Sequence, residues 1–368
     1  MIPLRIQVEG ATREDPFVVR LSGATADTTI SGLWDALLVH SEDEKCAYQT
    51  RHGELRLSGI RSSDLAGDVL LVDPTRKVGH RLLRAESPHN AFLVTERCDQ
   101  ICTMCSQPPK RYHVDLFPLF QQAAVLAPKG MTIGITGGEP MLFKDQVFEL
   151  LRRTLAARPD LSFHVLTNAQ HFDETDVGIL RELSNGKVLW GVPLYARESS
   201  LHDAIVRKPG AFDKLMNSLG VLARGGALIE LRTVVLKTNA PALESLAEYV
   251  SVQLPFISKW AIMQLENIGF GRMNWDKLFF DNSECFAPIG AAIDVARGRG
   301  VNVALYNFPL CTVPESYRAF AAPSISDWKQ RYLRECDGCV SRKDCGGFFT
   351  WYPEARGFSR LGLEQIEA

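Results

Sequence analysis

The chain has 368 residues, of which 46% are hydrophobic and 23% are charged, a composition that supports one or two folded domains with a full core. Its net charge is −2, so the overall charge calls for neither nucleic acid nor an anionic membrane as a partner. No secretion signal is readable at the start, and no apolar run of about 18 or more residues could span a bilayer, so we expect a cytoplasmic protein.

Residues 1–88 predict a small β-rich domain. Short segments in which polar and apolar residues alternate, such as 4–10, 54–60 and 68–73, are separated by clusters of Gly, Asp, Ser and Thr. This part of the chain contains no group of residues with an evident catalytic pattern.

Residues 89–300 predict an α/β domain, because six apolar strand patterns alternate with helix patterns. Such alternation is typical of a parallel sheet covered by helices. An open or partial barrel and a doubly wound sheet both fit the pattern. The strands are expected within 91–98, 131–140, 161–168, 187–195, 228–238 and 259–266, and the helices within 114–127, 145–157, 176–183, 212–226, 241–253 and 288–297.

Residues 301–368 are expected to form an appended C-terminal unit. It would begin with the apolar segment 301–311 and contain a helix around 326–333, followed by the last cysteines of the chain.

Three of the nine cysteines, Cys98, Cys102 and Cys105, have the spacing C-x3-C-x2-C in the loop after the first strand of the α/β domain. In a reducing compartment, clustered cysteines favour metal binding or catalysis over disulfides. Parallel barrels keep their active sites on the face where this loop lies. Three thiolates suit an iron–sulfur cluster with one open iron, whereas a zinc site would need a remote fourth ligand. Cys46 and Cys285 stand alone, and we expect both to be small buried hydrophobic residues.

The second strand ends in Gly137, Gly138, Glu139 and Pro140, so this loop opens on the same face as the cysteines. Taken alone, Gly-Gly-Glu-Pro is a turn signal. Combined with the three cysteines in the loop after the preceding strand, it makes zinc the weaker alternative.

The C-x3-C-x2-C loop, the Gly-Gly-Glu-Pro loop and the alternating elements together resemble the radical S-adenosylmethionine (SAM) superfamily. The resemblance implies a partial (β/α)6 barrel and a 4Fe–4S cluster that is held by Cys98, Cys102 and Cys105, with SAM on the open iron. In that family the reduced cluster cleaves SAM to methionine and a 5′-deoxyadenosyl radical, which removes a hydrogen atom from the substrate. The protein orients the cofactors and excludes water.

The resemblance also implies a set of SAM-binding residues. The main chain of Gly137 and Gly138 would approach the methionine part of SAM because these residues have no side chain, with Glu139 in support. Arg232 would pair with the SAM carboxylate. The full set is Met104 near adenine, Gly137, Gly138, Glu139, Thr167, Asn168 and Arg232, with Glu266 and Asn267 bordering the adenosine. Thr167 and Asn168 could equally end a strand, Arg232 could be an ordinary salt-bridged arginine, and His202 with Asp203 could contact substrate or begin a solvated helix.

The second cysteine group consists of Cys336, Cys339 and Cys345 at C-x2-C-x5-C, with Cys311 upstream. Four thiolates could close a 4Fe–4S cluster or a zinc site. The spacing resembles the SPASM/twitch extensions that bind auxiliary 4Fe–4S clusters in radical SAM maturases. The full SPASM pattern has seven cysteines, and none stands four residues after Cys345, so one auxiliary cluster is expected.

Residues 87–109 and the C-terminal cysteines resemble the HxsC-type maturases of the His-Xaa-Ser peptide systems, over most of residues 67–350. This resemblance implies a peptide or small-protein substrate, an electron donor such as a flavodoxin or ferredoxin, and a second radical SAM maturase as a partner. Residues 1–88 would then help to dock the substrate, for example by adding a strand to a sheet edge. The alternatives are a radical SAM enzyme for a small metabolite or nucleotide, with an open auxiliary iron, and a non-catalytic zinc protein.

Overall fold

The computed structural model describes residues 3–23 and 35–362 of the chain. The chain divides into two compact units. The first comprises Met1–Val94, Val114–Thr136 and Asp145–His164, and the second comprises Thr95–His113, Gly137–Lys144 and Val165–Ala368. Both predicted cysteine groups and all the predicted SAM-binding residues lie in the second unit.

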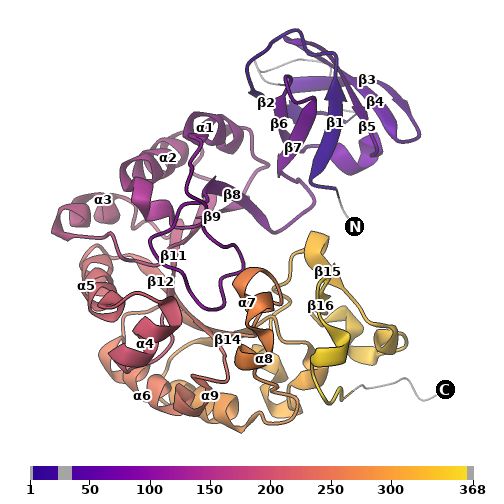
Figure 1. Cartoon of the computed structure of the whole chain (residues 1–368). Helices are drawn as coiled ribbons and strands as arrows, with labels where there is room; N and C mark the ends of the chain where they lie inside the picture. The colour runs from indigo at the N-terminus through magenta and orange to yellow at the C-terminus, as the bar shows by residue number, and fades with distance from the viewer. Residues whose placement is uncertain (1–2, 24–34, 363–368) are drawn as a thin grey trace. The chain divides into compact units, whose positions relative to one another are not determined.

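Seven strands of the first unit, indigo to violet in Figure 1, close into a barrel in the order β1-β5-β4-β3-β2-β6-β7, and β7 pairs with β1. Alternate strand residues point inward, so that side chains such as Leu21, Tyr48 and Leu55 fill the interior. The strands are β1 (Arg5–Glu9), β2 (Phe17–Leu21), β3 (Asp35–Glu42), β4 (Lys45–Thr50), β5 (Gly53–Ser58), β6 (Val69–Asp73) and β7 (Val78–Leu83).

This barrel confirms the β-rich domain that the sequence predicts. It contradicts the expected mode of substrate docking, because each of the seven described strands already has two neighbours. A closed barrel has no edge strand to which an extended peptide could add. Closure depends on pairing between distant strands, which the local sequence pattern does not report.

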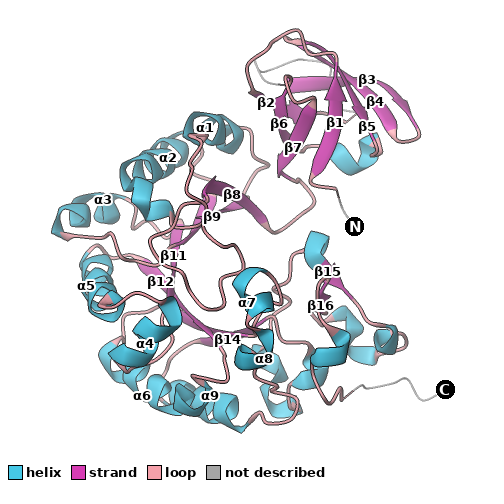
Figure 2. Cartoon of the chain, in the orientation of Figure 1, coloured by secondary structure: helices cyan, strands magenta, loops and turns pink. Residues whose placement is uncertain are grey.

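The strands of residues 90–306 form a seven-stranded sheet in the order β14-β13-β12-β11-β10-β9-β8, and β11 to β14 pair in parallel. In the second unit, α5, α6 and α9 lie along one side of β11, β12 and β14 (Figure 2). The strands are β8 (Asn90–Thr95), β9 (Thr132–Gly137), β10 (Ser162–Leu166), β11 (Val188–Pro193), β12 (Leu228–Val234), β13 (Lys259–Met263) and β14 (Val303–Tyr306). The helices are α1 (Phe117–Val125), α2 (Lys144–Ala157), α3 (Val177–Glu182), α4 (Ser199–Val206), α5 (Ala211–Arg224), α6 (Leu243–Gln253), α7 (Gly269–Met273), α8 (Trp275–Leu278) and α9 (Ala287–Gly298).

The strand order decides between the two architectures that the sequence left open. A doubly wound sheet reverses its strand order at a switch point, as in 3-2-1-4-5-6. Here the spatial order follows the chain without reversal, which is the order of an open or partial barrel. The sheet also has a seventh strand, β14, which the sequence analysis assigned to the appended C-terminal unit.

The segment after β14 consists mainly of short 3-10 turns, and the predicted helix at 326–333 is wrong. A turn at Asp327–Lys329 leads into β15 (Gln330–Arg331), which pairs antiparallel with β16 (Phe348–Phe349). The Gln330 side-chain amide also donates to the Gly346 carbonyl oxygen at 2.7 Å. Pairing with a distant strand overrides the local helix pattern.

The two isolated cysteines differ in the structure. Cys46 is buried, as the sequence predicts, whereas Cys285 is exposed, so the prediction of a buried Cys285 is wrong. Cys285 lies in the turn before α9, where its N–H donates to the Asp281 carbonyl oxygen at 3.3 Å. Among the described residues, no helix has the length and apolar character needed to cross a bilayer.

Candidate functional site

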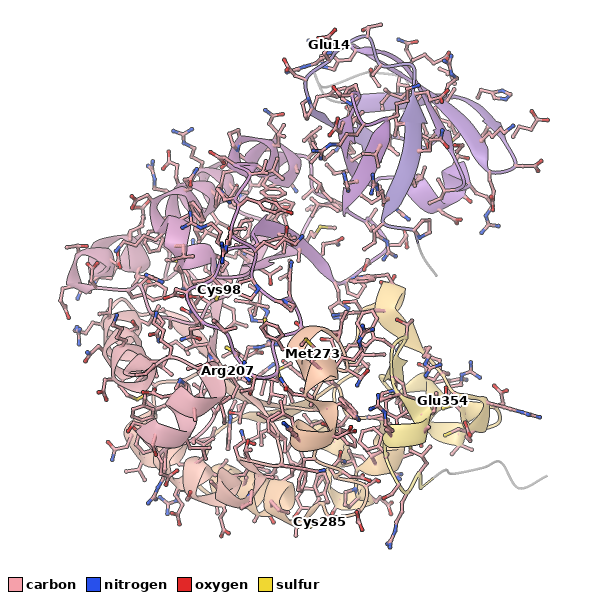
Figure 3. The ribbon with its side chains drawn as sticks, viewed as in Figure 1. Glu14, Cys98, Arg207, Met273, Cys285 and Glu354 are labelled. Atoms are coloured by element: carbon pink, nitrogen blue, oxygen red, sulfur yellow. The ribbon has the colours of Figure 1, made fainter. Side chains whose placement is uncertain are left out.

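The three cysteines of the first group lie on one loop that follows β8. Cys98, Cys102 and Cys105 are free, partly buried thiols, and Figure 3 labels the first of them. The loop turns tightly between the last two, because the Cys105 N–H donates to the Cys102 carbonyl oxygen at 3.1 Å. The structure therefore presents three thiols on one short loop at the carboxyl end of the first strand of the sheet.

Burial and mutual repulsion govern the acidity of these thiols. Burial raises the pKa of Cys98 and of Cys102 to about 12, and it also raises the pKa of Cys105. At Cys102, negative charge on Cys105 and Cys98 adds to the effect of burial. The thiolate is the form that binds metal, and a bound cation lowers the pKa of its ligands. Without a metal, these thiols stay largely protonated. A bound metal cation would offset both their burial and the repulsion between their negative charges, so the three thiols suit a metal site.

The Gly-Gly-Glu-Pro loop packs directly against the start of the cysteine loop. The N–H groups of Gly138 and Glu139 donate to the carbonyl oxygens of Thr95 at 2.8 Å and Arg97 at 2.7 Å. A Cβ atom on Gly137, which has φ +146°, would lie 2.0 Å from the Thr95 oxygen, and one on Gly138 would lie 2.1 Å from the Arg97 oxygen. The two glycines are therefore required for packing of backbone on backbone, a constraint that the sequence analysis did not foresee.

Glu139 is fully buried, and its carboxylate joins the loop after β9 to the loop after β10. One oxygen accepts from the Met141 N–H at 2.8 Å and the Thr167 hydroxyl at 2.6 Å, and the other accepts from the Asn168 N–H at 2.5 Å. Burial raises the Glu139 pKa to about 7, against the opposing effect of these hydrogen bonds. Glu139 and Thr167 thus fix the ends of β9 and β10 relative to each other and leave little of either side chain exposed.

We predict that Glu139→Gln lowers the free energy of unfolding by about 1–3 kcal/mol, because an amide offers one acceptor oxygen where the network needs two. Urea denaturation of the protein would measure this change. Glu149→Gln in α2, where a partly exposed carboxylate pairs with Arg152 and Arg153, is the matched control, and its effect should stay within about 0.5 kcal/mol. Equal stability of the Glu139 variant and wild type would contradict the role given to this carboxylate.

Asp99, inside the C-x3-C segment, fastens the cysteine loop to its surroundings. Its carboxylate accepts from the Asn168 side-chain amide at 2.8 Å, contacts His171 Nε2 at 3.2 Å and forms an ion pair with Lys208. Although burial alone would raise the Asp99 pKa, these partners outweigh it and hold the pKa well below its usual range. Asn168 Nδ2 also lies 3.9 Å from Cys98 Sγ, so this predicted residue does reach the cysteine loop.

Two helices complete the support of the loop. Near the end of α4, the carbonyl oxygens of Val206 and Ile205 accept the N–H groups of Ile101 and Thr103, at 3.3 and 2.9 Å. From α7, the Phe270 N–H donates to the Cys105 carbonyl oxygen at 2.8 Å. The cysteine loop is thus held along its length by backbone hydrogen bonds.

Gly269, the first residue of α7, packs closely against the backbone of the cysteine loop. We predict that Gly269→Ala impairs cluster assembly. Its φ is +56°, and a Cβ atom there would lie 2.5 Å from the Cys105 oxygen and 2.6 Å from the Ser106 oxygen, so the cysteine loop would have to move. Iron content after anaerobic reconstitution should fall by about four atoms per chain, since the cluster on Cys98, Cys102 and Cys105 would be lost. Gly298→Ala in α9, where an added Cβ meets nothing within 4 Å, should retain all its iron. Full iron content in the Gly269 variant would show that the loop tolerates displacement.

The other predicted SAM-binding residues have different surroundings. Met104 is 6% exposed and packs in an apolar cluster with Tyr195, as expected for an apolar position. Arg232 already has a carboxylate partner within the chain, because its guanidinium donates to Glu230 Oε1 at 2.5 Å. The Tyr306 hydroxyl donates to the other Glu230 oxygen at 2.9 Å. Any contact of Arg232 with SAM therefore depends on its remaining N–H groups.

Asp203 lies in α4, which follows β11, and Glu266 and Asn267 lie just after β13; the sequence analysis named all three. Asp203 accepts from the N–H groups of Gly210 at 2.6 Å and Phe212 at 2.8 Å, which favours a structural role at a helix start. Asn267 is 5% exposed, and among the described residues its Nδ2 has no hydrogen-bond partner. A buried donor without a partner is costly unless a ligand satisfies it, so Asn267 fits a bound polar group such as a nucleoside. Glu266 lies 3.7 Å from Lys329 Nζ.

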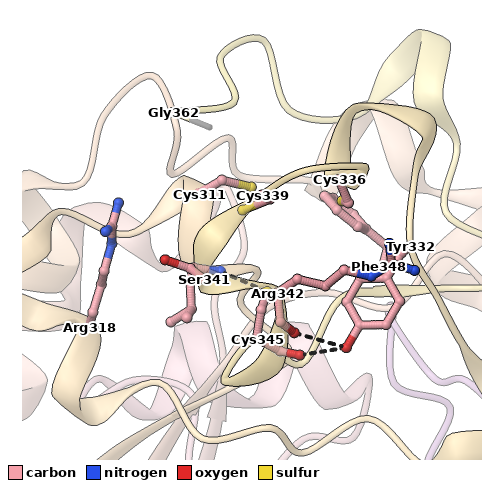
Figure 4. Close-up of a pocket in the computed structure, with 11 residues that line it drawn as sticks. Cys311, Arg318, Tyr332, Cys336, Cys339, Ser341, Arg342, Cys345, Phe348 and Gly362 are labelled. Carbon is pink, nitrogen blue, oxygen red and sulfur yellow. Dashed lines mark hydrogen bonds between the residues drawn. The ribbon is translucent and has the colours of Figure 1, made fainter. Parts of the chain in front are cut away.

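The four cysteines of the second group line one pocket, which Figure 4 shows. Cys311 comes from a 3-10 turn after β14, and the others come from the turns before β16. Burial raises the Cys311 pKa to about 12, and negative charge on Cys345 and Cys336 adds to the rise. Two backbone donors, Leu310 N–H and Gly347 N–H, point at Cys345 Sγ from 3.4 and 3.3 Å. Cys311 thus lines the same pocket as the other three cysteines, and their role as four ligands of one cluster stays a prediction.

Among residues 3–23 and 35–362, no group of three or more His, Cys, Asp or Glu side chains is arranged as a site for a metal ion. Such a group would be a compact single-ion site, as in zinc proteins with Zn–S bonds of about 2.3 Å. A four-iron cluster is larger than one ion, and its thiolates stand farther apart. The chemistry of both donor sets, three and four thiols with little else, fits iron–sulfur clusters.

Sequence reasoning missed the residues that hold the cysteine loop, namely Asp99, His171, Lys208 and Gly269. A signal for Asp99 was available, because a carboxylate between two metal-binding thiols needs a cationic partner in order to be buried. The partner itself, Lys208, was not predictable, since it lies more than 100 residues away in the chain. Gly269 follows the last predicted strand, and its positive φ depends on packing against the cysteine loop.

Comparison with known families gives one match. Residues 92–250 match the model of the radical SAM superfamily. This segment contains the cysteine loop, the Gly-Gly-Glu-Pro loop, most of β8 and the whole of β9 to β12. A search of curated proteins finds no match to this sequence.

Solved structures resemble parts of the chain. Streptococcus suis SuiB bound to S-adenosylmethionine is 16% identical, with a TM-score of 0.48 over 61% of this chain and 51% of that chain. SuiB bound to its precursor peptide SuiA gives the same identity and TM-score, over 61% of this chain and 49% of that chain. A radical SAM methyltransferase from Sphaerobacter thermophilus is 14% identical, with a TM-score of 0.43 over 73% and 76% of the two chains. This chain spans about half the length of SuiB, and at these TM-scores the likeness carries no argument about activity.

Proposed function

We propose that this protein, a radical SAM enzyme by the domain that it carries over residues 92–250, acts on a peptide substrate and matures a ribosomally made peptide. The observation that carries the proposal is the construction of the cysteine loop. Three thiols that act electrostatically on one another are held on one loop, and none of the other described cysteines lies on that loop. An open coordination position is where a catalytic metal centre binds its substrate or cofactor.

The residues present fit both the cluster and SAM. Cys98, Cys102 and Cys105 would hold the cluster. The main chain at Gly137 and Gly138, the side chain of Asn168, and Met104 with Arg232 would border SAM, while Glu139 and Thr167 hold these loops in place. The unpaired, buried Nδ2 of Asn267 supports a polar ligand at the end of β13. When both cofactors are bound, they supply a 5′-deoxyadenosyl radical that removes a hydrogen atom from the substrate.

A second, saturated cluster at Cys311, Cys336, Cys339 and Cys345 is part of the proposal. Its support is the single pocket that all four cysteines line. With four protein ligands, each iron of a 4Fe–4S cluster has its thiolate and none is open for a substrate. This argues against the alternative in which a small metabolite binds directly to an auxiliary iron.

The peptide class rests on the resemblance of residues 87–109 and of the C-terminal cysteines to the HxsC-type maturases. The direct test uses the peptide that is encoded by a short His- and Ser-rich reading frame next to the gene of this protein. This peptide would be incubated with SAM and the reconstituted, reduced enzyme. We expect the peptide to change mass while 5′-deoxyadenosine accumulates above the level without peptide. An unchanged peptide, together with unstimulated SAM cleavage, would contradict a substrate of this type. A second radical SAM maturase remains a proposed partner in this system.

A further inference from the structure

Four polar side chains on β12, β13 and β14 form one connected group. Glu230 is 1% exposed, and it accepts from the Arg232 guanidinium at 2.5 Å and from the Tyr306 hydroxyl at 2.9 Å. Lys259, the first residue of β13, donates from Nζ to the same hydroxyl at 3.3 Å. Its Nζ lies 5.8 Å from the centre of the Tyr306 ring. This group, here termed the inner cluster, therefore contains two cations and one carboxylate.

The inner cluster lies on the face of the sheet that α5, α6 and α9 do not cover. Residues two apart on a strand share a face, so Glu230 and Arg232 point to the same side. The intervening Leu231 is fully buried, as expected for the side along which these helices lie (Figure 2). By contrast, Arg232, Lys259 and Tyr306 are each partly exposed. A ligand on this face of the sheet can therefore reach them.

Lys259 has no carboxylate partner among the described residues. Within residues 90–306, all of which the structure describes, Glu230 is the only carboxylate on the strands of the sheet, and Arg232 and Tyr306 already bind it. A partly buried ammonium without a counter-ion is costly unless a ligand supplies the negative charge. The loops that lead into β11 to β14 contain no Asp or Glu either, namely 184–187, 225–227, 254–258 and 299–302.

We propose that the Lys259 ammonium binds a carboxylate of the peptide substrate. The inference rests on the proposed function, because it needs a peptide that lies on the inner face of the sheet. An ammonium has three donors, and the Tyr306 hydroxyl takes one of them, so the other donors are available to a carboxylate. Hydrogen bonds between charged partners are the strong ones, so this contact would fix the position of the residue that carries the carboxylate.

This carboxylate is distinct from that of SAM. Glu266 and Asn267, the residues predicted to border the adenosine, follow the carboxyl end of β13. Lys259 begins this five-residue strand, so its backbone lies roughly 13 Å from the last residue, at about 3.3 Å per residue. Lys259 and the predicted adenosine site therefore stand at opposite ends of β13.

The test measures the affinity of the reconstituted, unreduced enzyme with SAM for the labelled peptide from the His- and Ser-rich reading frame. Fluorescence anisotropy gives this affinity without turnover. Lys259→Met should weaken binding at least about tenfold, because a hydrogen bond between charged groups is lost, whereas Lys259→Arg should retain most of the affinity. Lys214→Met, which replaces an exposed lysine on α5 of the same unit, is the matched control and should bind like wild type.

A set of peptides in which each carboxylate in turn, including that of the C-terminus, is converted to an amide identifies the partner of Lys259. One amide peptide should bind wild type as weakly as the unchanged peptide binds Lys259→Met, and that variant should not distinguish the two peptides. The affinity of Lys259→Met for SAM should equal that of wild type.

The outcomes separate this inference from the proposed function. Unchanged peptide affinity in Lys259→Met, or a loss by the same factor for every peptide of the set, would overturn the inference. Weaker SAM binding with intact peptide binding would overturn it too, because the carboxylate would then belong to SAM. Failure of the wild type to bind any of these peptides would instead overturn the proposed peptide substrate on which the inference rests.

Discussion

Replacing Cys98, Cys102 and Cys105 together with alanine should abolish formation of 5′-deoxyadenosine from SAM. These thiols share one loop, and negative charge on Cys105 raises the pKa of both Cys98 and Cys102, so we expect them to act as one ligand set. Iron content after anaerobic reconstitution should fall from roughly eight to roughly four atoms per chain, since each 4Fe–4S cluster holds four. The fold should survive, because the loop is held by backbone hydrogen bonds to Ile205 and Val206 and by the Asp99 side chain.

Liquid chromatography of the anaerobic reaction, with dithionite as reductant, measures the nucleoside directly. Cys285→Ala is the matched control, because Cys285 is an exposed free thiol that belongs to neither group. That control should keep wild-type iron content and cleavage. Continued release of 5′-deoxyadenosine by the triple variant would mean that the active site lies elsewhere in the chain.

Replacing Cys311 and Cys339 with alanine should separate the two sites. Both residues line the pocket of the second cysteine group, and only Cys336 and Cys345 would remain there to hold a cluster that needs a thiolate on each iron. We expect the variant to lose roughly four iron atoms per chain and all modification of the peptide. Cleavage of SAM without peptide should persist, because none of the residues that hold the first cysteine loop belongs to this pocket.

Iron determination, SAM cleavage and peptide mass spectrometry on one preparation would distinguish the outcomes. Full iron content in the double variant would show that the second group binds no cluster. Loss of SAM cleavage together with the iron would show that the two cysteine groups do not act independently. The Cys285→Ala protein is again the control, and it shows how much iron and activity are lost through purification and oxidation alone.

The elements that follow from local pattern were predictable, and those that depend on distant pairing were not. Alternating apolar strands and helices predicted the α/β domain, since residues 228–238 and 259–266 contain β12 and β13. The closed N-terminal barrel was missed because β1 pairs with β5 and β7, which are far from it in the sequence. Residues 326–333 have an apolar spacing that suits a helix. The strand β15 forms there instead, because its backbone pairs antiparallel with β16.

The residues of the candidate site also fall into those that the local sequence predicts and those that it does not. The cysteines and the Gly-Gly-Glu-Pro loop carried enough local information to be found. The partner of Arg232 could also have been predicted from the sequence. Glu230 lies two residues earlier on the same strand, and residues at this spacing share a face of the sheet. The partners of Asp99 could not be predicted from the sequence. His171 and Lys208 belong to separate parts of the chain, which come together only in the folded protein.

The most direct test of the central claim is the fate of SAM on the wild-type protein. The chain would be purified and reconstituted with iron and sulfide under anaerobic conditions, reduced with dithionite and incubated with SAM. The account predicts that 5′-deoxyadenosine and methionine appear in equal amounts, and that neither appears without reductant. Intact SAM after prolonged incubation with a fully reconstituted, reduced protein would contradict the assignment of the Cys98, Cys102 and Cys105 loop as a radical SAM site.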